Sequence, residues 1–62
     1  MKSYYDVLQF LKGFGTFIYT GDARSDLEMM MAEVKELYEK GLIMKEDYLK
    51  ALMILRAEHR GK

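Results

Sequence analysis

Few side chains in this sequence have the types and spacing that catalysis or metal binding requires. His59 is the single histidine and the chain has no cysteine, so neither a zinc site nor a cysteine nucleophile can be assembled. Asp22 and Asp26 lie one turn apart on a predicted helix and could approach one cation, but oxygen sites need more ligands. Helix capping and the helix dipole account for both carboxylates. We therefore expect no enzyme active site, no metal and no cofactor.

The most informative segment is an uncharged, glycine-punctuated stretch, residues 13–21, which is rich in aromatic and β-branched residues. Proteins that bind single-stranded nucleic acid stack bases on aromatic rings and hold the phosphates with lysine or arginine. Phe17 and Tyr19 lie in this stretch, and Lys12 and Arg24 flank it. These residues form a candidate nucleic-acid surface.

The same rings have a structural interpretation, in which Phe14 and Phe17 cover a small core. Residues 16–20 have the composition of a β-strand, but no second strand candidate exists to pair with them. We therefore predict an extended connector folded back over the helices. Because side chains alternate along an extended segment, one of Ile18 and Tyr19 should point outward. The sequence leaves open whether the rings are exposed or belong to the core.

Protein contact is the alternative function. Met29 falls on the acidic face of its predicted helix, and methionine is a common adaptable residue at interfaces. Met53 and Ile54 lie off the main apolar stripe of the last predicted helix, so that helix should be packed on two sides or meet a partner. Met29, Met53 and Ile54 are therefore the candidate interface residues, either for another protein or for self-association.

Three predicted helices must position these residues. Ser3 with Asp6 opens the first helix in a capping-box pattern, and Gly13 and Gly15 end it. Its apolar residues follow the spacing of an amphipathic helix: Tyr4, Val7, Leu8, Leu11 and Phe14.

The second helix is predicted to run from an N-cap at Asp22 to a stop at Gly41, with Ser25 and Glu28 as a rival capping box. Its apolar stripe is uninterrupted: Leu27, Met30, Met31, Val34, Leu37 and Tyr38.

The third helix is predicted from about Lys45 to Arg60, and Met44 before it is a poor N-cap. We expect Leu52 to be buried where this helix meets Leu37 of the second. The whole expected inner face is Tyr48, Ala51, Leu52 and Leu55.

The composition fits one small globular domain, residues 1–62, with half of its residues apolar and no net charge. Residues 22–40 carry six acidic against three basic side chains, and residues 45–62 carry five basic against three acidic ones. This is not the pervasive positive charge of many nucleic-acid-binding proteins. No apolar run is long enough to span a membrane and no signal peptide is evident, so we expect a cytoplasmic protein without a membrane partner.

Several short strings, spread over most of the chain, are typical of one family: Tyr4-Tyr5-Asp6-Val7, Gly15-Thr16-Phe17-Ile18-Tyr19-Thr20-Gly21-Asp22, Asp26-Leu27-Glu28-Met29-Met30, Glu36-Leu37-Tyr38 and Ile54-Leu55-Arg56. On these strings the chain resembles the YqgQ-like family of small bacterial proteins. The resemblance implies a three-helix fold and suggests single-stranded nucleic-acid binding as a function.

The sequence thus predicts an all-α fold, a compact three-helix bundle with an extended aromatic, glycine-rich connector between the first and second helices. As a function it predicts a small non-enzymatic binding module. The expected partner is single-stranded nucleic acid or, alternatively, another protein or a second copy of the chain.

Overall fold

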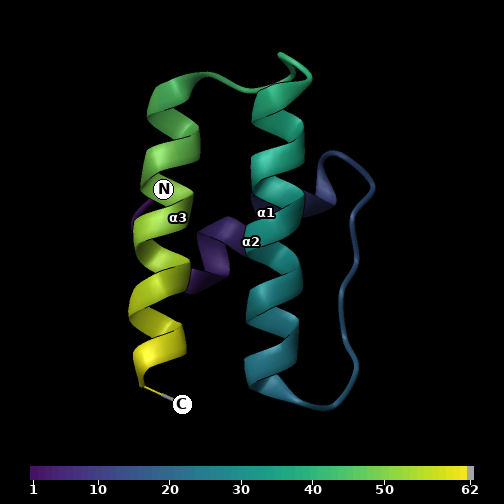
Figure 1. Ribbon diagram of the computed structural model, residues 1–62, viewed down its shortest axis with the longest axis vertical. Helices are drawn as coiled ribbons and strands as arrows, with labels where there is room; N and C mark the ends of the chain where they lie inside the picture. Colours follow the sequence, from purple (N-terminus) through teal and green to yellow (C-terminus); the bar gives the residue numbers. More distant parts are fainter. Residues whose placement is uncertain (62) are drawn as a thin grey trace.

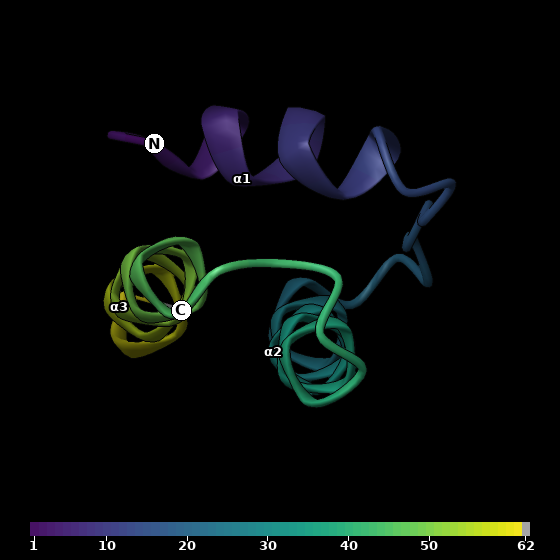
Figure 2. The same cartoon turned by 90° about the horizontal axis from the view of Figure 1, so that it is seen from above.

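The structure, a computed structural model, describes residues 1–61. The chain forms three helices, α1 (Tyr4–Lys12), α2 (Ala23–Glu39) and α3 (Lys45–Arg60). Helices α2 and α3 lie side by side as an antiparallel hairpin, and α1 lies across one face of it (Figure 1, Figure 2). Helix α3 packs along α2 and also contacts α1. The predicted all-α three-helix fold is confirmed, and α3 is its central helix.

A capping box starts α1, as its sequence predicts. The Ser3 hydroxyl accepts a hydrogen bond from the backbone N–H of Asp6 at 3.3 Å, and the Asp6 carboxylate accepts one from the backbone N–H of Ser3 at 3.2 Å. The same carboxylate accepts a bond from the backbone N–H of Lys2 at 2.9 Å. The bond from the Lys2 amide, with a smaller contribution from the Ser3 amide, lowers the pKa of Asp6.

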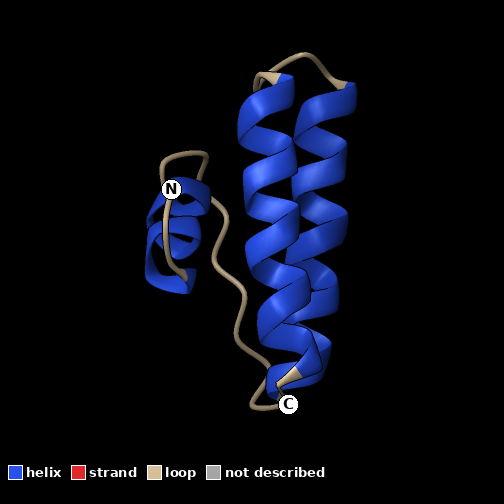
Figure 3. Ribbon diagram, turned by 90° about the vertical axis from the view of Figure 1, so that its left-hand side faces the viewer, coloured by secondary structure: helices blue, strands red, loops and turns tan. Residues whose placement is uncertain are grey.

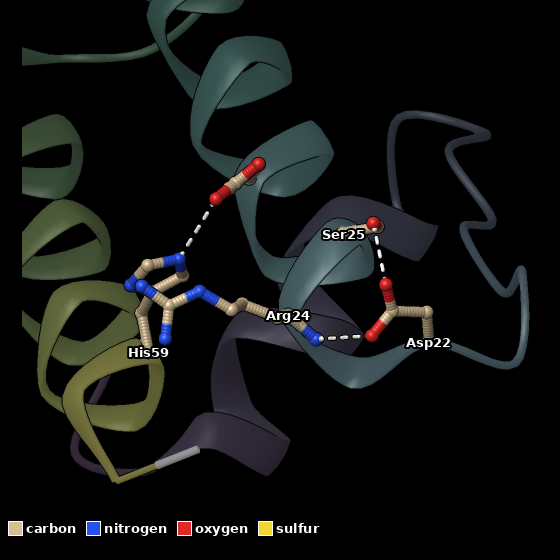
Figure 4. Close-up of polar contacts among 5 residues, drawn as sticks. Asp22, Arg24, Ser25 and His59 are labelled. Carbon is tan, nitrogen blue, oxygen red and sulfur yellow. Dashed lines mark hydrogen bonds and ion pairs between the residues drawn. The ribbon is translucent and has the colours of Figure 1, made fainter.

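The ends of α2 are set by the residues that the sequence indicates. The Asp22 carboxylate accepts a hydrogen bond from the backbone N–H of Arg24, so Asp22 is the N-cap. The Ser25 hydroxyl donates to the same carboxylate at 2.8 Å and therefore supports this cap rather than replacing it (Figure 4). At the other end Gly41 has a φ of +75°, and the N–H of the next residue bonds the carbonyl of Leu37, which closes the helix.

Aromatic stacking joins α2 to the start of α3. The rings of Tyr38 and Tyr48 are stacked with their centroids 4.6 Å apart and their planes inclined by 2°. Met44 makes no side-chain cap hydrogen bond, as predicted. The hairpin end is therefore stabilised by ring contact rather than by an N-cap.

All three helices and the α2–α3 turn contribute to the hydrophobic core. The prediction that Leu52 is buried is wrong in part, because Leu52 is half-buried and lies outside the core cluster. Ile54, which was predicted to lie off the inner face of α3, packs against the core cluster instead. The buried apolar residues are Val7, Leu11, Leu27, Met30, Val34, Leu37, Ile43, Ala51 and Leu55.

Candidate binding surface

The connector, residues 13–21, runs along the side of α2 that faces away from α3 (Figure 1), and seen from the side it lies between α1 and the pair of longer helices (Figure 3). Side-chain hydrogen bonds hold it to α2 at two places. Near its start, the Thr16 hydroxyl donates to Glu33 Oε2 at 3.2 Å. Near its end, Asp26 Oδ1 accepts bonds from the backbone N–H and the hydroxyl of Thr20, at 2.8 and 2.6 Å. Asp26 and Glu33 are about two turns apart on one face of α2, so that face carries the connector.

Asp26 has a second role that its sequence position does not reveal. Its side chain is only 6% exposed, and a carboxylate at such a site needs hydrogen-bond partners. Both donors that meet it come from Thr20, six residues earlier in the chain. Asp26 therefore fixes the connector to α2, in addition to complementing the helix dipole.

The side chains between these two attachments alternate in direction. Ile18 is half-buried and packs against the core, whereas Phe17 is 73% exposed and Tyr19 is 89% exposed. The prediction that one of Ile18 and Tyr19 points outward is confirmed. The interpretation of Phe14 and Phe17 as core covers is wrong, because both are exposed, although the Phe14 ring meets the Phe10 ring edge-on at 5.3 Å.

The two predicted basic residues lie differently with respect to these rings. Lys12 is exposed at the last residue of α1, directly before the connector. Arg24 is exposed too, but its side chain extends from the first turn of α2 toward His59 on α3 (Figure 4). There His59 Nε2 lies 3.0 Å from Glu28 Oε2 and links the two helices. Since the connector is on the other side of α2, Arg24 is not placed beside the rings.

Carboxylates, rather than bases, lie next to the connector on α2. Asp26 and Glu33 bind its two threonines, and Asp22 caps the helix directly after it. Each donor here is a neutral hydroxyl or amide. The local field beside the rings is therefore acidic, which favours a ligand that binds by stacking or apolar contact over one held by many phosphates.

Met29 lies on the same face of α2 as the two attachment residues. It follows Asp26 by three residues and precedes Glu33 by four, the spacing at which helical side chains are neighbours. It is also exposed. The sequence assigns Met29 to a protein interface, and its register on α2 puts it between the two residues that hold the connector.

The other predicted interface residues, on α3, separate from one another. Met53 is 71% exposed, whereas Ile54 is half-buried and packs against the core. Leu49, which sequence reasoning missed, is 45% exposed and lies one turn before Met53. The spacing of four residues between Leu49 and Met53 is the signal that could have identified this pair.

Residues 1–61 contain no cluster of three acidic or histidine side chains of the kind that a metal site would require. These residues enclose no pocket. None of their helices is both long enough and apolar enough to cross a membrane.

The sequence profile of the YqgQ-like family matches residues 1–61. The chain is 45% identical over 58 residues to a Bacillus subtilis (strain 168) protein named uncharacterized protein YqgQ, and the match covers 94% of this chain and 82% of that relative. The similarity extends over the connector and all the helices.

Proposed function

The chain belongs to the YqgQ-like family, and we propose that it is a non-enzymatic binding module that contacts single-stranded nucleic acid through its connector. The observation that carries the proposal is the exposure of Phe17 and Tyr19 on one outward side of an anchored, extended segment. Rings held in this way offer their faces to bases without a rearrangement of the fold. Each stacked base contributes about 1–3 kcal/mol to the free energy of binding.

The charges around the rings define what kind of binding to expect. Lys12 is the predicted base that remains near the connector, while Arg24 extends toward α3. The carboxylates of Asp26 and Glu33 oppose a polyanion. We therefore expect weak binding that is led by stacking, with a shallow dependence on salt, because few phosphate contacts release few counterions.

A titration of a fluorescently labelled oligothymidylate, followed by anisotropy at low and moderate salt, tests this function. Tyr19→Ala and Phe17→Ala should each weaken binding by about 1–3 kcal/mol if the ring stacks on a base. Lys12→Ala should reduce the slope of log K against log salt concentration by about one, the loss expected for one phosphate contact. The absence of binding to the parent protein at low salt would exclude the proposal, since the electrostatic contribution is greatest there.

Two matched variants control for indirect effects. Met53→Ala removes an equally exposed apolar side chain from α3 and should leave oligonucleotide binding unchanged. Arg24→Ala removes a base that points away from the connector (Figure 4) and should have little effect. A loss with Arg24→Ala as large as with Tyr19→Ala would move the binding surface to the α2–α3 side.

A protein interface on α3 is a second candidate function, and a separate observation favours it. Leu49 and Met53 expose apolar side chains one turn apart, away from the core. Exposed apolar groups that lie together on one helix face are typical of contact surfaces. If this face binds a partner or a second copy, Met53→Glu should abolish that association and leave oligonucleotide binding intact, as sedimentation and the same titration would report.

A further inference from the structure

Residues 16–20 of the connector run beside α2 as an extended segment, and within residues 1–61 no strand pairs with them (Figure 1). Phe17, Ile18 and Tyr19 make no backbone hydrogen bond to another residue within 1–61. Their aromatic and β-branched side chains favour strand pairing. The hydrogen bonds of Thr16 and Thr20 to α2 hold this stretch in place at both ends. It is therefore a preformed template to which another extended segment can add.

Nothing in the sequence of this edge opposes such pairing. Exposed strand edges are usually protected by a lysine, a proline or a bulge. Residues 13–21 contain no charged residue and the chain contains no proline. The covered side of the strand is already satisfied, because Ile18 packs on the core. A strand that pairs with the connector would thus meet an uncharged edge, supported from beneath by α2 and the core.

The order of residues in the strand identifies the segment that fits it. Residues 16–20 read Thr-Phe-Ile-Tyr-Thr, which is nearly the same in both directions. In an antiparallel pair of two such strands centred on Ile18, Phe17 of each copy is opposite Tyr19 of the other. Aromatic residues directly opposite one another stabilise a strand pair. A self-complementary patch of this kind is what a two-fold symmetric dimer requires.

We propose that two copies of this chain associate by pairing their connectors as antiparallel strands about a two-fold axis at Ile18. The dimer places both Phe17 rings and both Tyr19 rings on one outer face, as a four-ring platform. This inference rests on the proposed function in one respect: the platform enlarges the stacking surface that single-stranded nucleic acid would use. The pairing itself follows from the backbone and the residue order alone.

Cross-linking tests the register directly, because the chain has no cysteine of its own. Phe17→Cys and Tyr19→Cys proteins are mixed in equal amounts and oxidised gently. Directly opposite residues lie about 4.5–5.5 Å apart between Cα atoms, whereas identical positions are diagonal, at about 7–8 Å, beyond easy disulfide reach. The mixed disulfide should therefore clearly exceed the roughly one half that random pairing yields. A random mixture would overturn the proposal.

Charge placement tests the association without cross-linking. Phe17→Lys with Tyr19→Lys sets like charges opposite each other twice in the dimer, whereas Phe17→Lys with Tyr19→Glu sets opposite charges there. All these side chains are exposed in the single chain, so both variants should fold, as circular dichroism would confirm. The second variant should dimerise roughly tenfold more tightly than the first. Equal association of the two, or a parent chain that stays monomeric at millimolar concentration in sedimentation equilibrium, would refute the pairing.

The controls separate this inference from the proposed function. Met53→Glu lies on α3 and should leave dimerisation unchanged; if it abolishes the dimer, the α3 face is the interface and the connector pairing is wrong. A cross-linked dimer in the expected register that binds no oligonucleotide would support the pairing and reject the nucleic-acid function. Oligonucleotide binding by a strictly monomeric chain would support the nucleic-acid function and reject the pairing.

Discussion

Replacing Asp26 by alanine should destabilise the protein by about 2–4 kcal/mol, far more than the loss of an ordinary dipole partner. The side chain is 6% exposed and accepts two hydrogen bonds from Thr20, at 2.8 and 2.6 Å. Each hydrogen bond to a charged group contributes about 1.5–3 kcal/mol. Removal of a buried carboxylate also relieves part of its desolvation penalty, which brings the net loss below the sum of the two bonds.

Two milder substitutions divide this effect between its parts. Thr20→Val keeps the backbone donor and loses the hydroxyl, and should cost about 1.5–3 kcal/mol. Asp26→Asn keeps an acceptor oxygen and loses the charge, so it should cost about half as much as Asp26→Ala, since charge roughly doubles the strength of such bonds. Glu28→Ala is the matched control, because within residues 1–61 this exposed carboxylate pairs with His59 alone, and its loss should cost about 1 kcal/mol or less.

Urea unfolding followed by far-ultraviolet circular dichroism measures all four variants. The reasoning is refuted if Asp26→Ala costs no more than Glu28→Ala, because the bonds to Thr20 would then contribute nothing to the free energy of unfolding.

Three further predictions address the core, the α2 cap and the dependence of stability on pH. Leu55→Ala should cost about 2–5 kcal/mol and Leu52→Ala clearly less in urea unfolding, since only Leu55 is fully buried; equal losses would return Leu52 to the core. Asp22→Ala should cost about 0.5–2 kcal/mol and Ser25→Ala less, because the Ser25 hydroxyl bonds Asp22 and caps no amide itself; the opposite order would make Ser25 the cap. The pKa of Asp6 is lowered, chiefly by the Lys2 amide, so its carboxylate stabilises the fold above the unfolded pKa, and this contribution disappears as the pH falls through the folded pKa. Asp6→Asn should therefore flatten the acid limb of a stability–pH profile, and an unchanged limb would contradict the capping box.

The helix ends could be predicted because local chemistry determines them. Ser3 with Asp6, Asp22 and Gly41 act within one turn of their own positions. The absent cap at Met44 could be predicted for the same reason. Strong local signals thus required no knowledge of how the helices pack.

The inner face of α3 could not be predicted fully, because its apolar stripe has an apolar residue on each side. Leu52 and Ile54 flank the line of Ala51 and Leu55. Which of them becomes covered depends on where α1 lies across the hairpin, and no feature of α3 itself specifies that. In the structure both are partly exposed, but Ile54 packs against the core cluster and Leu52 does not.

The sequence identified the connector as the candidate surface but left open which of its rings are exposed. Alternation along an extended segment predicted that either Ile18 or Tyr19 is exposed, and the structure exposes Tyr19 together with Phe17. Whether Arg24 or Met29 faces the connector depends on which side of α2 the connector follows. That path is set by the bonds of Asp26 and Glu33 to two threonines, which are contacts between separate elements.

The unequal lengths of the two links between helices have a consequence for the order in which the chain folds. Five residues join α2 to α3 and ten join α1 to α2, and this doubling adds only about 0.6 kcal/mol to loop closure. The hairpin contacts, with the Tyr38–Tyr48 stack beside the turn, are nevertheless the most local in the fold, and local contacts form first. The hairpin should therefore be the folding nucleus, with α1 docking late. Mutations at Leu37 should then slow folding, whereas those at Val7 should mainly speed unfolding, and the opposite pattern in a chevron analysis would place α1 in the nucleus.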